Sequence, residues 1–243
     1  MGARVDHRSA DLLSAALAKG AAALYIWRMR YRFRSAITAL CLCAPLPVSA
    51  HPHVFIDTGL TLVTDATGQL LGIEVSWTYD DLYSMLLFED MGVDQDFDGR
   101  LSDREITRLD GFDMQWVPGF EGDLFVTMGE NTVRLGAPEP RGTSVADARI
   151  TTRHYRPLNA PVPVTDVAVR AYDPTYYTAY ELTQGVALEG GVACSVAVVP
   201  ADLDRAYTMV EEMLYAQPAD QMENNFPEVG EAFADTVTVT CDT

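Results

Sequence analysis

One stretch of the sequence has the residue types and the spacing that calcium binding requires. It covers the twelve residues from Asp94 to Glu105. Calcium is a hard cation that takes about six to eight oxygen ligands, which such a loop supplies from its positions 1, 3, 5, 7, 9 and 12. Gly99 stands at the sixth position, where the chain must turn with a positive φ angle. The expected ligands are five side chains and one backbone carbonyl, that of the arginine: Asp94, Asp96, Asp98, Arg100, Ser102 and Glu105. We therefore expect one calcium ion (Ca2+) in this loop.

The loop and its flanks resemble the EF-hand family over roughly 30 residues, and a second loop of this kind is not found. Leu101, at the eighth position, is the apolar residue that packs between the two helices of such a unit. Asp80 or Asp81 can cap the first helix, and Gly111 ends the second. The resemblance implies an EF-hand-like helix-loop-helix insert over about residues 80–111, with a structural or modest-affinity site.

A second set of candidate metal ligands lies at the start of the predicted mature chain. Alternate residues of a strand point to one side, so His51, His53 and Asp57 can share a face. His154 can complete the site if its strand neighbours the first one. Imidazole nitrogens suit zinc, nickel and cobalt, so we expect Zn2+, Ni2+ or Co2+ at these residues. The alternative is that each histidine is an ordinary solvated or hydrogen-bonded residue.

Enzymatic chemistry has little support in the sequence. It contains no G-x-S-x-G, H-E-x-x-H, phosphate-binding glycine loop or C-x-x-C, so we do not expect an enzyme. If cleavage falls after Ala50, the amine and imidazole of His51 can form a copper brace, which stays open as an alternative. The amino-terminal copper and nickel motif that uses the second amide is excluded, because Pro52 has no amide proton.

Residues 1–50 have the pattern of a signal peptide. Four arginines between residues 28 and 34 precede an apolar run that is too short to span a bilayer comfortably, and the run ends in Val48-Ser49-Ala50. Residues 1–28 are either an over-called start or a long basic region. We expect a single exported domain over residues 51–243, without an integral membrane segment.

The charge of the predicted mature chain is strongly negative. Residues 51–243 contain ten Arg, no Lys and 33 Asp or Glu, a formal net charge of −23. Such a surface repels nucleic acid and anionic lipid and attracts cations. Solubility or salt adaptation is the alternative explanation of the bulk charge.

Two cysteines remain in the mature chain, Cys194 and Cys241. An even pair in an exported chain predicts a disulfide bond, which would tie the C-terminal segment to an earlier strand. A metal-binding or redox pair is the alternative, although the long separation argues against a redox C-x-x-C motif.

Strand patterns dominate the mature chain. Residues 53–63 and 69–79 predict two strands, and Ile73, Val75 and Trp77 alternate with polar residues. We expect an α+β fold of mostly antiparallel, sandwich-like β structure, with the EF-hand-like insert and one C-terminal helix.

Four segments together resemble a specific family: His-Pro-His-Val-Phe-Ile-Asp at 51–57, Trp-Thr-Tyr-Asp-Asp at 77–81, the calcium loop, and Tyr-Asp-Pro-Thr-Tyr-Tyr at 172–177. They are similar to an uncharacterised bacterial family labelled as the periplasmic component of an ABC-type transport system, whose members are often encoded beside nickel/cobalt-type permeases. Members of that family usually have Trp at the position of Phe55 and Phe at the position of Tyr79. The resemblance implies a periplasmic protein that handles transition metals with a membrane metal permease or ABC-type transporter.

Two functions from different classes follow. The first is an exported calcium-binding accessory protein for zinc, nickel or cobalt transport or homeostasis, in which calcium keeps the neighbourhood of the histidine site ordered. The second is a calcium-stabilised periplasmic interaction module, whose acidic face docks a basic partner and whose histidines have no transition-metal role.

Overall fold

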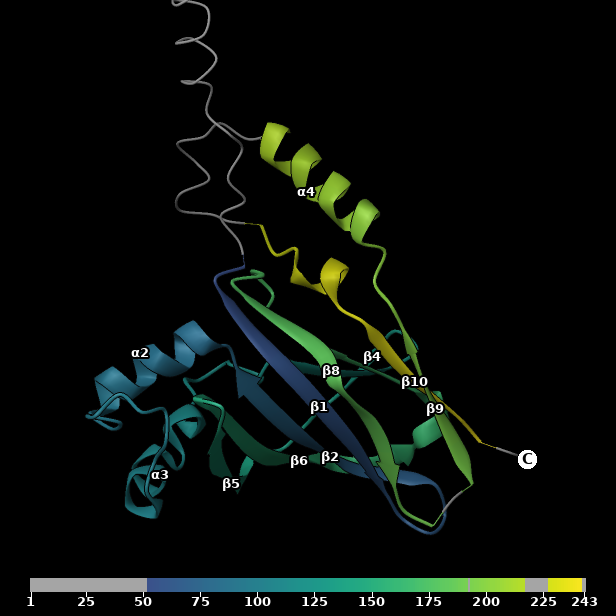
Figure 1. Ribbon diagram of the computed structural model, residues 1–243. Helices are drawn as coiled ribbons and strands as arrows, with labels where there is room; N and C mark the ends of the chain where they lie inside the picture. Colours follow the sequence, from purple (N-terminus) through teal and green to yellow (C-terminus); the bar gives the residue numbers. More distant parts are fainter. Residues whose placement is uncertain (1–51, 192, 217–226, 242–243) are drawn as a thin grey trace, which may run out of the picture. The chain divides into compact units, whose positions relative to one another are not determined.

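The structure is a computed structural model that describes residues 52–191, 193–216 and 227–241. The predicted signal peptide and His51 lie outside the described residues. Within the unit that spans residues 50–243, the strands form two five-stranded sheets, sheet A and sheet B (Figure 1).

Sheet A contains the longest strands, in the order β5-β6-β2-β1-β8. Their bounds are β1 (Val54–Thr64), β2 (Gln69–Tyr79), β5 (Glu139–Ala146), β6 (Arg149–Pro163) and β8 (Thr178–Glu189). β1 pairs with β8 in parallel, whereas its pairing with β2 is antiparallel, as are those of β2 with β6 and of β5 with β6. The first two strands are joined by a turn in which the Asp65 carboxylate accepts hydrogen bonds from the backbone N–H groups of Thr67 and Gln69.

Sheet B is antiparallel throughout, in the order β4-β3-β7-β10-β9. Its strands are β3 (Leu124–Met128), β4 (Asn131–Val133), β7 (Val167–Ala171), β9 (Cys194–Val199) and β10 (Thr236–Cys241). Cys194 and Cys241 lie opposite each other on β9 and β10 and form a disulfide bond, which confirms the predicted pairing.

The two sheets share one hydrophobic core. Every second side chain is buried along β1 and from Ile73 to Tyr79 along β2, as the alternation in the sequence predicts. Leu60 and Ile73 of sheet A belong to the same buried cluster as Val126, Val169 and Val237 of sheet B. Full burial of one such side chain contributes about 1.5–3 kcal/mol, so this cluster supplies much of the stability.

The helices are few. They are α2 (Asp81–Met91), α3 (Asp103–Leu109) and α4 (Leu203–Ala216), with the short 3-10 helices η1 (Phe112–Met114), η2 (Val164–Asp166) and η3 (Gly230–Phe233). None of the described helices has the length and apolar character that crossing a membrane demands.

Helix α2 begins and ends with well-defined caps. The Asp80 side chain accepts a hydrogen bond from the Tyr83 backbone N–H at 2.8 Å and another from the Phe55 backbone N–H at 2.8 Å. Gly92 ends the helix in the left-handed conformation, with φ 62°. The first cap therefore fixes the helix to the start of β1.

The expected EF-hand-like helix-loop-helix insert over about residues 80–111 is wrong, although the α+β class broadly fits. The described chain is dominated by its two sheets, and the two helices of this segment are attached to sheet A, α2 to β6 and α3 to β5. Phe88 of α2 and Leu109 of α3 are buried in the common core. The spacing of loop ligands sets local loop geometry only, so it did not predict where the two helices pack.

Candidate functional site

The acidic loop, residues 94–105, brings three of its predicted ligands together. Carboxylate oxygens of Asp94, Asp96 and Asp98 all lie within 4.8 Å of one another. Asp94 is buried, whereas Asp96 and Asp98 are exposed. The group is therefore anchored in the protein on one side and open to solvent on the other.

Backbone amides hold two of these carboxylates in place. Asp94 Oδ1 accepts hydrogen bonds from the backbone N–H groups of Asp98, at 3.1 Å, and Gly99, at 3.2 Å. Asp98 Oδ1 accepts one from the backbone N–H of Arg100 at 2.8 Å. Gly99 has φ 71°, the positive angle that the turn requires. The loop is thus already folded around its own acidic side chains.

Glu105 closes the loop from its far end. Its Oε2 accepts hydrogen bonds from the Ser102 backbone N–H, at 2.9 Å, and the Ser102 hydroxyl, at 2.7 Å. Its Oε1 accepts one from the backbone N–H of Asp94 at 3.2 Å. The bonds from Ser102 are the largest cause that lowers the pKa of Glu105. Glu105 therefore joins the start and end of the loop but is not one of the three converging carboxylates.

A hollow beside the loop is lined by the remaining predicted ligands, Arg100, Ser102 and Glu105, and also by Asp96. Arg108 of α3 donates hydrogen bonds to the carbonyls of Met91 and Gly92, at the end of α2. The end of α2 and the last turn of α3, on either side of the loop, are therefore connected through polar contacts.

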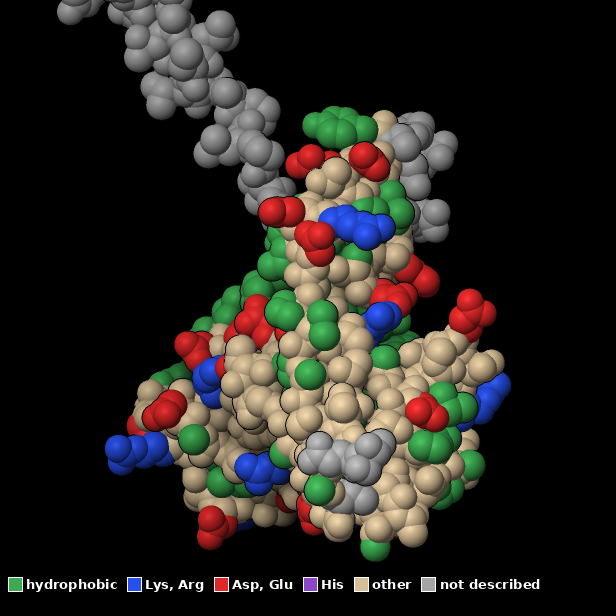
Figure 2. Space-filling view, turned by 90° about the vertical axis from the view of Figure 1, so that its right-hand side faces the viewer, with side chains coloured by type: hydrophobic (Ala, Val, Ile, Leu, Met, Phe, Trp, Pro, Cys, Tyr) green, Lys and Arg blue, Asp and Glu red, His purple; other side chains and the backbone are tan. Residues whose placement is uncertain are grey.

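Acidic side chains are common elsewhere on the surface. On the face shown in Figure 2 they are spread over its upper and lower parts, with basic side chains between them. Bulk acidity alone therefore does not identify a metal site. What distinguishes the acidic loop is the convergence of its carboxylates.

Two of the predicted transition-metal ligands lie at the outer surface. His53 is exposed just before β1, and its ring lies 4.8 Å from that of Tyr177. Asp57 pairs with Arg149 at 2.7 Å and accepts a hydrogen bond from the Thr183 hydroxyl at 2.5 Å. That hydrogen bond is the largest cause that lowers the pKa of Asp57.

His154 lies on the other side of sheet A. Its side chain is fully buried, and its ring packs edge-on against those of Trp77, at 4.6 Å, and Trp116, at 5.8 Å. Both ring nitrogens lack a hydrogen-bond partner among the described residues. Burial first, and nearby Arg156 second, lower the pKa of His154 to about 4. The structure therefore keeps His154 apart from Asp57 and neutral at ordinary pH.

Sequence reasoning missed an exposed apolar surface on α2. Leu82, Met85 and Leu86 recur at helical spacing, which usually indicates a core-facing stripe. All three are more than half exposed, while Ser84 and Phe88 face the protein. The signal was present in the sequence, but only the structure shows that this stripe faces solvent. We call these three residues the α2 apolar face.

Comparison with protein families gives a match over most of the chain. A family model described as "Protein of unknown function (DUF1007)" matches residues 36–241. A search of the curated proteins found none that matches. The family match includes every described strand from β1 to β10.

Proposed function

We propose a function for this chain from its own residues, because it belongs to DUF1007, a family of proteins of unknown function. In our proposal it is an exported protein that binds one calcium ion in the acidic loop and uses the neighbouring α2 apolar face to dock a partner protein. The disulfide bond between Cys194 and Cys241 supports the exported location, since such bonds persist in oxidising compartments.

The observation that carries the proposal is the convergence of Asp94, Asp96 and Asp98 within 4.8 Å. Three carboxylates so close together repel one another, and a divalent cation removes that repulsion. An all-oxygen set of ligands suits calcium, whereas zinc, nickel and cobalt favour the imidazole or thiolate ligands that this loop lacks.

The acidic loop is well placed to affect α2. The helix ends at Gly92, Val93 is buried in the core, and Asp94 follows directly. An ion bound by Asp94 and its two neighbouring carboxylates would hold the end of α2 in position. Calcium would thereby order the helix that carries the apolar face.

The chemistry of the α2 surface indicates its partner. Leu82, Met85 and Leu86 are exposed, and the same helix carries the exposed acidic residues Glu89 and Asp90. An apolar surface beside negative charge is complementary to a segment that is both apolar and basic. We infer a protein partner of that kind in the periplasm.

The transition-metal role has less support. His53 and Asp57 lie on the outer side of sheet A, and Asp57 is already paired with Arg149. His154 is buried on the opposite side. The interaction module is therefore the function that the geometry favours over an accessory role in zinc, nickel or cobalt transport.

The test is the effect of calcium on thermal unfolding of the purified exported protein. At about a hundredfold excess over Kd, calcium is expected to stabilise the fold by about 2.7 kcal/mol, a rise in Tm of roughly 5–10 °C. The Asp94→Asn/Asp98→Asn variant should lose this rise. Its matched control is Glu211→Gln/Glu212→Gln on α4, which removes the same charge and should keep it. An equal rise in both variants would refute the assigned loop.

A further inference from the structure

The outward side of sheet A contains a hollow whose floor crosses four strands. Across the sheet, Arg153 of β6 lies opposite Ser76 of β2, Ser76 opposite Gly59 of β1, and Gly59 opposite Gly185 of β8. Side chains in such a row share one face of the sheet. Because three of these four positions have a small side chain or none, the row forms a hollow of about 390 Å³. Small-molecule sites typically enclose about 300–1,000 Å³.

The structure explains why glycine occupies positions 59 and 185. A Cβ atom at Gly59 would approach the Gln184 Cβ to 3.1 Å, so a larger residue would displace that side chain. Gly185 has φ 84° and lies next to the irregularity in the pairing of β1 with β8. This angle favours glycine. The irregular pairing and the bare floor therefore belong to the same local structure.

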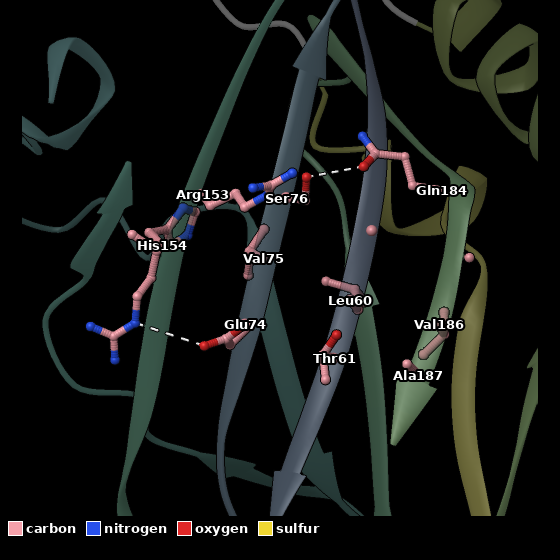
Figure 3. A pocket seen from close by; sticks show the side chains of 13 residues that line it. Leu60, Thr61, Glu74, Val75, Ser76, Arg153, His154, Gln184, Val186 and Ala187 are labelled. Atoms are coloured by element: carbon pink, nitrogen blue, oxygen red, sulfur yellow. Dashed lines mark hydrogen bonds and ion pairs between the residues drawn. The ribbon is translucent and has the colours of Figure 1, made fainter. Parts of the chain in front are cut away.

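One wall of the hollow is a fixed amide. Gln184 Nε2 donates hydrogen bonds to the Asp57 carbonyl, at 2.6 Å, and the Thr78 hydroxyl, at 2.9 Å. Its Oε1 accepts a hydrogen bond from the Ser76 hydroxyl at 3.0 Å (Figure 3). The opposite wall contains Thr61 together with Glu74, which pairs with Arg141 at 3.7 Å. The walls thus present polar groups in defined positions.

Arg153 differs from its neighbours because its charge is uncompensated. Arg141 and Arg149 each pair with a carboxylate, whereas Arg153 makes no ion pair with any described residue. It is exposed and reaches from β6 toward Ser76 on β2 (Figure 3). The charged side chains of the lining are Arg153, Arg141 and Glu74, which leaves one net positive charge in a chain whose net charge is −18.

We propose that this hollow binds a small ligand with one carboxylate and several hydroxyl groups, of the sugar-acid class. The Arg153 guanidinium binds the carboxylate through charge-assisted hydrogen bonds. The hydroxyl groups of Ser76 and Thr61 are available to the ligand hydroxyls, and Gln184, whose two amide protons are already donated, can accept one further hydrogen bond at its Oε1. A dianion fits less well, because Glu74 and the acidic chain repel a second negative charge.

The inference is independent of the calcium proposal. The hollow and the acidic loop share no residue, and the hollow belongs to sheet A alone. Loss of calcium binding would therefore leave the sugar-acid proposal standing, and the reverse also holds.

The experiment is a calorimetric titration of the purified exported protein with D-glucuronate. We expect a Kd of about 1 mM, because binding depends on one charge-assisted contact, from Arg153 to the carboxylate, and on weak neutral hydrogen bonds. Arg153→Gln should weaken binding about tenfold or more. D-Glucose, which has the same ring without the carboxylate, should also bind about tenfold more weakly or worse.

The matched control is Arg205→Gln, an exposed arginine on α4 that lies outside the hollow. It should leave the affinity for D-glucuronate unchanged. A Tm of Arg153→Gln equal to that of the parent protein would show that the variant is folded. Absence of D-glucuronate binding, equal binding by Arg153→Gln, or equal affinity for D-glucose or inorganic phosphate would each overturn the proposal.

Discussion

At the residue scale, polar side chains of β6 occupy core positions. Arg156 is buried, yet its Nε donates to the Gly136 carbonyl at 3.0 Å and its Nη1 to the Glu121 carbonyl at 2.6 Å. Its guanidinium also lies over the Trp116 ring at 4.6 Å. These contacts offset the cost of burying the charge. His154 has no comparable partner among the described residues, so it is kept neutral instead.

The burial of His154 predicts a dependence of stability on pH. The unfolded chain protonates this histidine below about pH 6.5, while the folded chain does so only below about pH 4. The folded state therefore binds fewer protons in that range, and its stability falls as the pH falls through it. His154→Phe keeps the aromatic packing and should remove this loss of stability. The loss amounts to about 3 kcal/mol of unfolding free energy between pH 6.5 and 4.

The measurement is urea unfolding of parent and His154→Phe at several pH values. A comparison of the two is needed because Asp123 acts in the opposite direction. Burial raises its pKa to about 7, so it favours the folded state as the pH falls. If the free energy of unfolding depends on pH in the same way in the parent and in His154→Phe, the buried His154 is not the cause of the loss.

At the element scale, α2 has one face in the core and one in solvent. Phe88 is buried and Leu86 is about half exposed, although both are large apolar residues on one helix. The burial difference follows from attachment of α2 to β6 through one side only.

This difference predicts two separate effects of substitution. Phe88→Ala removes a buried ring and should lower the free energy of unfolding by about 3–5 kcal/mol. Leu86→Ser should change it by no more than about 0.5 kcal/mol, while it reduces capture of an apolar, basic partner. Denaturant unfolding tests both values, and a large loss of stability in Leu86→Ser would show that the α2 apolar face is part of the core.

At the scale of the whole molecule, the sequence predicted what depends on regular alternation. Ile73, Val75 and Trp77 are all buried on β2, as expected, and the Cys194–Cys241 disulfide is present. The orientation of β6 was not predictable. Thr152, His154 and Arg156 face the core there, so apolar alternation gave no sign of which side is buried.

Long-range pairing was likewise beyond the sequence. β1 pairs in parallel with β8, which lies more than 100 residues later, and this pairing places Gly59 opposite Gly185. Neither residue has a side chain whose chemistry marks a site. The hollow on sheet A arises only when four strands are in register. For that reason no local sequence motif predicted it.

The central claim is that three converging carboxylates hold one calcium ion. The most direct test is a calorimetric titration of the purified protein, first stripped of metal, with calcium and separately with zinc. We predict one calcium ion per chain with a Kd of roughly 10⁻⁴ M or below, no competing zinc binding in the loop, and loss of the calcium signal in Asp94→Asn/Asp98→Asn. A parent protein that takes up no calcium, or a double variant that binds it as tightly as the parent, would contradict the account.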